Sequence, residues 1–164
     1  MSPRAACRLE SLGFTQVFDY VTGMADWTAN GLPTEGQLAG VLRAGDAVQR
    51  DVPTCRLTER LGTVVERVKA AGQNVCIVTS AEGVVLGRLR GAAFNADPNA
   101  TIESVMETGP TTTRPDDALR ELTEHMGARR VGSMLVTTST GRLIGILYRK
   151  DAEEKLDASA DQVR

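Results

Sequence analysis

The sequence predicts an α+β fold in which two tandem β-α-β-β-α units pack sheet to sheet behind a short N-terminal α/β extension. The main observation is an internal repeat, because SAEGVVLGRL at 80–89 aligns with TSTGRLIGIL at 138–147 at a constant offset of 58 residues. Carried upstream without a gap, this offset pairs Leu61 with Leu119. We therefore expect two copies of one supersecondary unit.

Each copy begins with the spacing of an amphipathic helix. Apolar residues recur three or four positions apart, at Leu61, Val64, Val65 and Val68 in the first copy and at Leu119, Leu122 and Met126 in the second. One apolar stripe per helix needs a sheet to cover. Thr58 and Pro115-Asp116-Asp117 are expected to start the two helices, and Gly72 and Gly127 stand near their ends.

A β-hairpin is expected after each helix. The first strands are VCIVT at 75–79 and SMLVT at 133–137, and Gly83 and Gly141 suit the tight turns that follow. Short extended pieces precede the helices at 52–57 and 110–114. Closing helices are expected at 90–95 and 151–156, and Thr101 is a candidate cap in the linker between the copies.

These elements divide the chain into four parts. Residues 1–40 form the N-terminal extension, 46–100 the first unit, 101–157 the second unit and 158–164 a flexible tail.

Composition argues against several classes of function. With 19 Lys and Arg against 21 Asp and Glu, the net charge is -2, and no basic block favours nucleic acid. No stretch reaches the roughly 18–20 apolar residues of a membrane span, and the first residues lack an apolar signal core, so we expect a cytoplasmic protein without a membrane partner. Cys7, Cys55, Cys76 and the single His125 lack the spacing of a zinc site or a disulfide framework.

Three phrases in the second copy are similar to the CBS-domain pair, or Bateman module: ESVMETGPTTTRPDDAL at 103–119, VGSMLVTTSTGRLIGIL at 131–147, and Tyr148-Arg149-Lys150-Asp151. This resemblance covers about two-thirds of the chain. It implies a regulatory module that senses an adenosine-containing molecule of the AMP, ATP or S-adenosylmethionine type and that is not an enzyme. No catalytic residue, metal or permanent cofactor is expected.

The resemblance implies a ribose site at Asp151, which occupies the position of the acidic residue that accepts hydrogen bonds from ribose hydroxyls in this family. A carboxylate at a helix N-terminus is held ionised by the helix dipole. A plain N-cap aspartate explains the residue equally well, and the resemblance favours the ribose site. Tyr148 replaces the short hydroxyl residue of the family, while Arg149 and Lys150 are candidate phosphate contacts or solvated helix-start residues.

The adenine base would lie between the extended piece Thr111-Thr112-Thr113 and the strand residues Met134 and Val136, both of which could instead be sheet core; for Val136 we favour core. The first copy has Arg90 opposite Tyr148 and Ala93 opposite Asp151, so it lacks the ribose acceptor. One competent site per chain is therefore expected, in the second repeat.

The N-terminal part resembles the closing third of a rhodanese-like domain over residues 2–36. The matching marks are Gly13-Phe14, the expected strand QVFDY at 16–20, Gly23, Trp27 and Gly31-Leu32-Pro33. The family's nucleophile would precede this segment, and Cys7 falls within the helix, so no catalytic role passes to it. A piece this small should dock on a neighbour through Phe14, Phe18 and Trp27.

Two alternatives to the sensing module stay open. One is a ligand-free module for dimerisation or interaction, and the other is a sulfurtransferase fragment, for which the anion-binding loop is missing. We expect a homodimer, because modules of this family commonly associate through their helices.

Overall fold

The computed structural model describes residues 3–36 and 40–161. The N-terminal part holds α1 (Pro3–Ser11), α2 (Gly23–Ala29) and α3 (Ala44–Ala47). The first repeat and its linker hold β1 (Thr54–Cys55), α4 (Leu61–Ala70), β2 (Val75–Thr79), β3 (Val85–Arg90), η1 (Gly91–Asn95), α5 (Ile102–Val105) and β4 (Glu107–Thr108). The second repeat holds β5 (Thr112–Thr113), α6 (Leu119–Ala128), β6 (Ser133–Thr137), β7 (Leu143–Tyr148) and α7 (Arg149–Asp161).

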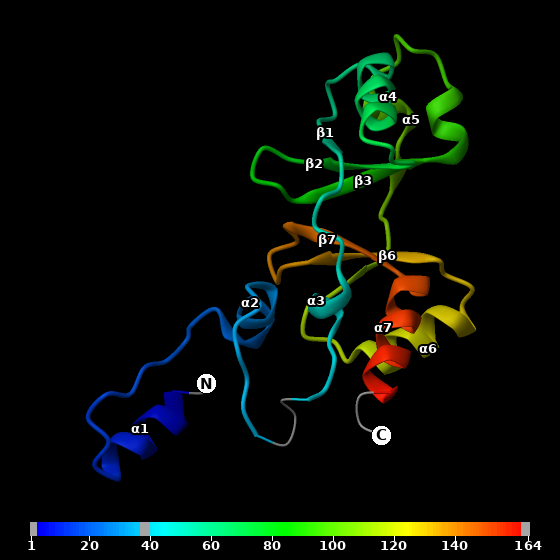
Figure 1. Cartoon of the computed structure of the whole chain (residues 1–164). Helices are drawn as coiled ribbons and strands as arrows, with labels where there is room; N and C mark the ends of the chain where they lie inside the picture. The colour runs from blue at the N-terminus through cyan, green and yellow to red at the C-terminus, as the bar shows by residue number, and fades with distance from the viewer. Residues whose placement is uncertain (1–2, 37–39, 162–164) are drawn as a thin grey trace.

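Two small sheets face each other, and the helices cover their outer sides (Figure 1). The first sheet has the order β1-β2-β3-β4 and the second has the order β5-β6-β7. Each pairs its first two strands in parallel and continues antiparallel through a hairpin. The predicted α+β class and the two tandem units are confirmed.

The repeat extends to the irregularities of the strands. The register shifts between Val78 and Thr79 in the first hairpin and between Val136 and Thr137 in the second. Gly83 and Gly141 have φ of 83° and 80°, as the hairpin turns require. The two units therefore share their backbone course at equivalent positions.

Three apolar clusters form the core. The first lies between α4 and its sheet, and the second lies between α6, α7 and their sheet. The third joins the inner faces of the two sheets and consists of the buried side chains of Val75, Ile77, Leu135 and Ile146. Because strand residues alternate between faces, each central strand supplies both an outer and an inner cluster.

The segment that precedes each repeat packs against the opposite repeat. Ala44 of α3 is fully buried in the core of the second repeat, whereas Ile102 of α5 is fully buried in the core of the first. Gln49 exchanges two backbone hydrogen bonds of 2.9 Å with Ile146 of β7. We call residues 43–49 the strap. The predicted division into units 46–100 and 101–157 stays a prediction. It assigns Ile102 to the second unit, although this residue packs in the core of the first.

Glycines in β3 and β7 let these segments cross the sheets. A Cβ on Gly145 would lie 2.1 Å from the carbonyl oxygen of Gln49, and a Cβ on Gly87 would lie 2.8 Å from that of Glu107. Real Cβ atoms do not approach an oxygen so closely. A side chain at position 145 would therefore push the strap off β7.

Several helix ends differ from the prediction. Helix α4 begins after Arg60, so Thr58 is not its cap, and Thr101 precedes α5 without a side-chain hydrogen bond to it. Gly127 lies inside α6, and Arg130 takes the positive φ of 53° beyond its end. Helix α7 continues to Asp161 instead of ending near Leu156.

The N-terminal part departs most from the prediction. Residues 16–20 form no strand, and Phe14 and Phe18 are 59% and 82% exposed. Trp27 is half-buried and donates its indole N–H to the carbonyl of Pro33 over 2.9 Å. Buried contacts of α2 come instead from Thr28, which lies near Gly45 of the strap, and from Ala29. Helix α1 has no buried residue and lies apart from both repeats in Figure 1.

Among the helices of residues 3–36 and 40–161, none is long and apolar enough to cross a membrane.

Candidate functional site

Asp151 stands in the first turn of α7, directly after β7, and its side chain is half-buried. Its carboxylate accepts a hydrogen bond of 2.8 Å from the side-chain amide of Gln49. Because Gln49 is fixed to Ile146 through its backbone, the strap holds this amide in place. The carboxylate keeps further lone pairs with which to accept hydroxyl protons.

Tyr148, three residues before Asp151, lines a cleft between the two repeats. The cleft has a volume of about 390 Å³, and its lining includes Tyr148 and Ser133 from the second repeat and Arg88 and Arg90 from the first. Burial, and secondarily the charge of Asp151, raise the pKa of the Tyr148 phenol. The phenol therefore stays protonated at neutral pH and can donate a hydrogen bond.

Arg149 and Lys150 form ion pairs along their own helix. Arg149 lies 3.7 Å from Glu153, and Lys150 lies 3.5 Å from Glu154. Neither residue lines the cleft beside Tyr148. Their observed contacts correspond to the helix-start interpretation, and the phosphate contact stays a prediction.

The three threonines before α6 are in different environments. Thr111 and Thr112 are exposed, and the carbonyl of Thr111 accepts a hydrogen bond from Leu135. Thr113 is buried, and its hydroxyl donates to Asp117 in the turn before the helix. Thr111 and Thr112 are therefore the members of this group that a ligand can reach.

Met134 and Val136 lie in the core under α6 and α7. Met134 is 5% exposed and Val136 is fully buried. Both point away from the cleft because they share the outer face of β6, while Leu135 takes the inner face. The expectation that Met134 lines an adenine site is therefore not supported, whereas the core interpretation of Val136 matches its burial.

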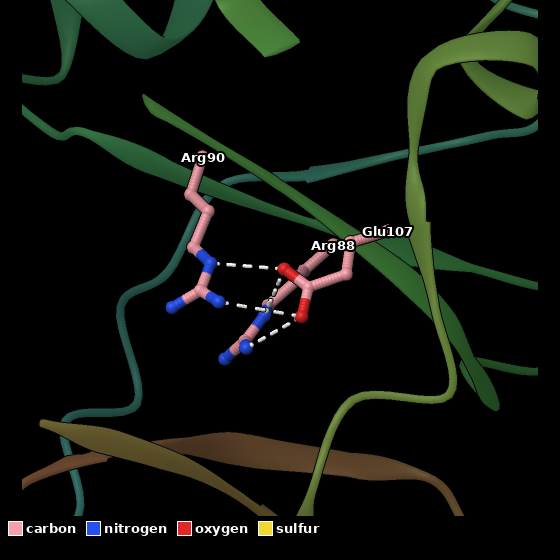
Figure 2. Close-up of polar contacts among 3 residues, drawn as sticks. All are labelled: Arg88, Arg90 and Glu107. Atoms are coloured by element: carbon pink, nitrogen blue, oxygen red, sulfur yellow. Dashed lines mark hydrogen bonds and ion pairs between the residues drawn. The ribbon is translucent and has the colours of Figure 1, made fainter. Parts of the chain in front are cut away.

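The first repeat has a different set of side chains at the equivalent positions. Ala93 stands in η1 and packs against the first core. Arg88 and Arg90 of β3 both bind the carboxylate of Glu107 in β4, as Figure 2 shows. The hydrogen bond from Arg88, followed by the charges of both guanidinium groups, lowers the pKa of Glu107 against the opposing effect of desolvation.

Sequence reasoning missed Gln49, Arg88 and Glu107. The offset of 58 residues, extended further upstream, places Gln49 at the equivalent of Glu107. That extension would have aligned the strap with the segment around Glu107, and both segments cross a sheet at a glycine, Gly145 and Gly87 respectively.

The cysteines and acidic residues are the other candidates for metal binding or nucleophilic chemistry. Within residues 3–36 and 40–161, no group of three or more His, Cys, Asp or Glu side chains is arranged to hold a metal ion. Cys55 and Cys76 are buried in the first core, and the hydrogen bond between them, together with burial, raises the pKa of the Cys55 thiol. A thiol in this state is a poor nucleophile.

Comparisons with known proteins show what the chain is similar to. The family model described as the CBS domain matches residues 102–157. The arabinose 5-phosphate isomerase KpsF of Escherichia coli is 30% identical over 112 residues, which make up 64% of this chain and 34% of that protein. The chain thus spans about a third of the length of the curated relatives it matches.

Solved structures give the fold of the whole pair. The cytosolic domain of the Mg²⁺ channel MgtE in complex with ATP has a TM-score of 0.64 at 21% identity, covering 72% of this chain and 51% of that one. The CBS domain pair of protein MJ0100, in complex with 5′-methylthioadenosine and S-adenosyl-L-methionine, has a TM-score of 0.61 at 15% identity, covering 72% and 98%. A CBS domain-containing protein from Bacillus anthracis scores 0.63 at 14% identity, covering 71% and 94%. This chain therefore carries a CBS domain at residues 102–157 and has the fold of a CBS-domain pair.

Proposed function

We propose that the chain is a regulatory module that binds an adenosine-containing molecule in its second repeat, with the ribose held by Asp151. The observation that carries this proposal is the half-buried Asp151 in the first turn of α7, three residues after Tyr148, which lines the cleft between the repeats. Ala93 stands at the equivalent position of the first repeat and offers no acceptor. The fold similarity to pairs solved with ATP, 5′-methylthioadenosine and S-adenosyl-L-methionine supports the class of ligand.

The site is suited to binding and not to bond chemistry. Asp151 would accept and Tyr148 would donate hydrogen bonds, and the exposed residues Thr111 and Thr112 would contact the base. A ribose hydroxyl would donate to a lone pair of Asp151 that the amide of Gln49 leaves free. The ligand and the strap would then share one carboxylate.

Asp151→Ala is expected to weaken a ribose-bearing ligand by about 10- to 150-fold, the range for hydrogen bonds to a charged group. Calorimetric titration with adenosine, AMP, ATP and S-adenosylmethionine measures this change. Asp157→Ala is the matched control, because Asp157 is an exposed acid on the same helix. Installing a carboxylate by Ala93→Asp should change the affinity little, and equal effects at positions 93 and 151 would contradict a site in the second repeat.

A ligand-free interaction module is the second candidate. The ion pairs of Arg149 and Lys150 and the hydrogen bond from Gln49 to Asp151 favour it, because all three charged groups already have partners within the chain. Absence of binding for all four ligands, with an unchanged fold, would decide for this candidate.

We further propose that the module forms a homodimer in the cytoplasm. Exposed apolar side chains at Leu12, Phe14, Phe18 and Val21 leave apolar area for association. Light scattering at micromolar concentration should give twice the mass of the 17.5 kDa chain. The mass of a monomer throughout this range would refute the dimer. A rhodanese-like origin of residues 1–40 is part of the same proposal, with no sulfur transfer expected.

A further inference from the structure

Glu107 binds two arginines at once on the cleft side of the first repeat. Its Oε1 accepts from the Nη2 atoms of Arg88 and Arg90 over 2.9 and 3.3 Å, and its Oε2 accepts from their Nε atoms over 3.1 and 2.9 Å. Figure 2 shows both guanidinium groups turning the same edge toward the carboxylate. This is the bidentate geometry with which arginine also binds phosphate.

Both arginines line the cleft that Tyr148 shares. Tyr148 ends β7 three residues before Asp151, lines this cleft and lies close enough to Asp151 to be affected by its charge. If the ribose lies at Asp151, as proposed above, a 5′ substituent that passes Tyr148 enters this cleft. The arginines are therefore the cations that the 5′ substituent would meet.

We propose that Glu107 occupies the arginine edges that a ligand phosphate would need, and so makes the site select adenosyl ligands without a phosphate. Around the cleft the charges of Arg88 and Arg90 are balanced by those of Glu107 and Asp151. The side chain of Arg88 is 9% exposed, so a phosphate would have to displace Glu107 from it or lie beside a second anion.

The second repeat shows that the fold does not require this cluster. The residues equivalent to Arg88, Arg90 and Glu107 there are Ile146, Tyr148 and Gln49, none of which carries a charge at neutral pH. The strap still crosses β7 through its backbone hydrogen bonds. Glu107 is therefore replaceable at this position without loss of the crossing.

Glu107→Gln tests the proposal, because it removes the competing charge and keeps the shape. In the unchanged protein, AMP and adenosine should bind with affinities within about threefold, whereas Glu107→Gln should tighten AMP about 10-fold and leave adenosine unchanged. Glu103→Gln, at an exposed acid of α5, should change neither affinity. An unchanged ratio in Glu107→Gln would overturn the proposal.

Two further measurements separate this proposal from the function on which it rests. Arg90→Gln, made with Glu107 unchanged, should leave the affinity for AMP as it is. A lower affinity for AMP, with the affinity for adenosine unchanged, would show that the arginines already bind phosphate. This variant tests the proposal if Glu107→Gln fails to fold. If adenosine binding does not depend on Asp151, the proposed function is wrong. Pyrophosphate then tests the role of Glu107 alone. Binding of pyrophosphate to Glu107→Gln but not to the unchanged protein supports the proposal that Glu107 blocks phosphate, and equal affinities refute it.

Discussion

Gly145→Ala is expected to lower the free energy of unfolding by about 3 kcal/mol or more, at the upper end of the cost of overpacking. The added Cβ would meet the carbonyl oxygen of Gln49 at 2.1 Å and a methyl group of Val48 at 2.8 Å. The first of these is backbone and cannot rotate away. The strap must therefore leave β7, which removes the backbone exchange between Gln49 and Ile146. Urea unfolding followed by circular dichroism measures the loss.

The control for this experiment is Gly40→Ala, since a Cβ there would meet no atom within 4 Å and the residue does not have a positive φ. Its free energy of unfolding should stay within about 0.5 kcal/mol of the unchanged protein. A stable Gly145→Ala protein would contradict the close approach of the strap. If it folds, the variant should also lose the hydrogen bond from Gln49 to Asp151 and show altered adenosine affinity.

The sequence predicted the repeat and the fold because the two hairpins carry the same pattern of apolar residues and turn glycines. Val78 and Val136 are both fully buried, and Gly83 and Gly141 both take positive φ. These features are local, so the spacing of residues along the chain determines them.

The strap could not be placed from local pattern. Residues 43–49 contain a four-residue helix whose only buried side chain is Ala44. That side chain packs in the core of the second repeat, and the backbone N–H of Ala44 donates to the carbonyl of Asp117, more than 70 residues further along. Contacts of this range leave no periodicity in the short segment itself.

The candidate site could be predicted only in part, because the local pattern does not show which distant segments meet. The sequence predicted that Asp151 follows a strand, and the structure has it in the first turn of α7, directly after β7. The sequence left Met134 open between the adenine site and the sheet core, because an apolar run that is buried on both faces gives no sign of which face each residue takes. The prediction that Phe14 and Phe18 dock on a neighbouring part of the chain was wrong, since both side chains are exposed.

Ile77→Ala is expected to destabilise both repeats together. Ile77 is fully buried in the cluster that joins the sheets, with Leu135 and Ile146 opposite. Truncation of such a side chain costs about 2–5 kcal/mol, because it leaves a cavity in addition to the lost transfer energy. Neither sheet can close this cavity alone, since its walls belong to both repeats.

Urea unfolding monitored by two probes tests whether the repeats depend on one another. Trp27 fluorescence reports on α2, whose residue Thr28 lies against Gly45 of the strap, and circular dichroism reports on both repeats. The two probes should give coincident transitions, shifted together by Ile77→Ala and by a smaller amount of about 0.5–1.5 kcal/mol by Ile77→Val. Val21→Ala, at a residue that is 91% exposed, should shift neither probe. Separate transitions for the two probes, with only the dichroism moved by Ile77→Ala, would show that the sheets do not support each other across the interface that also forms the cleft beside Tyr148.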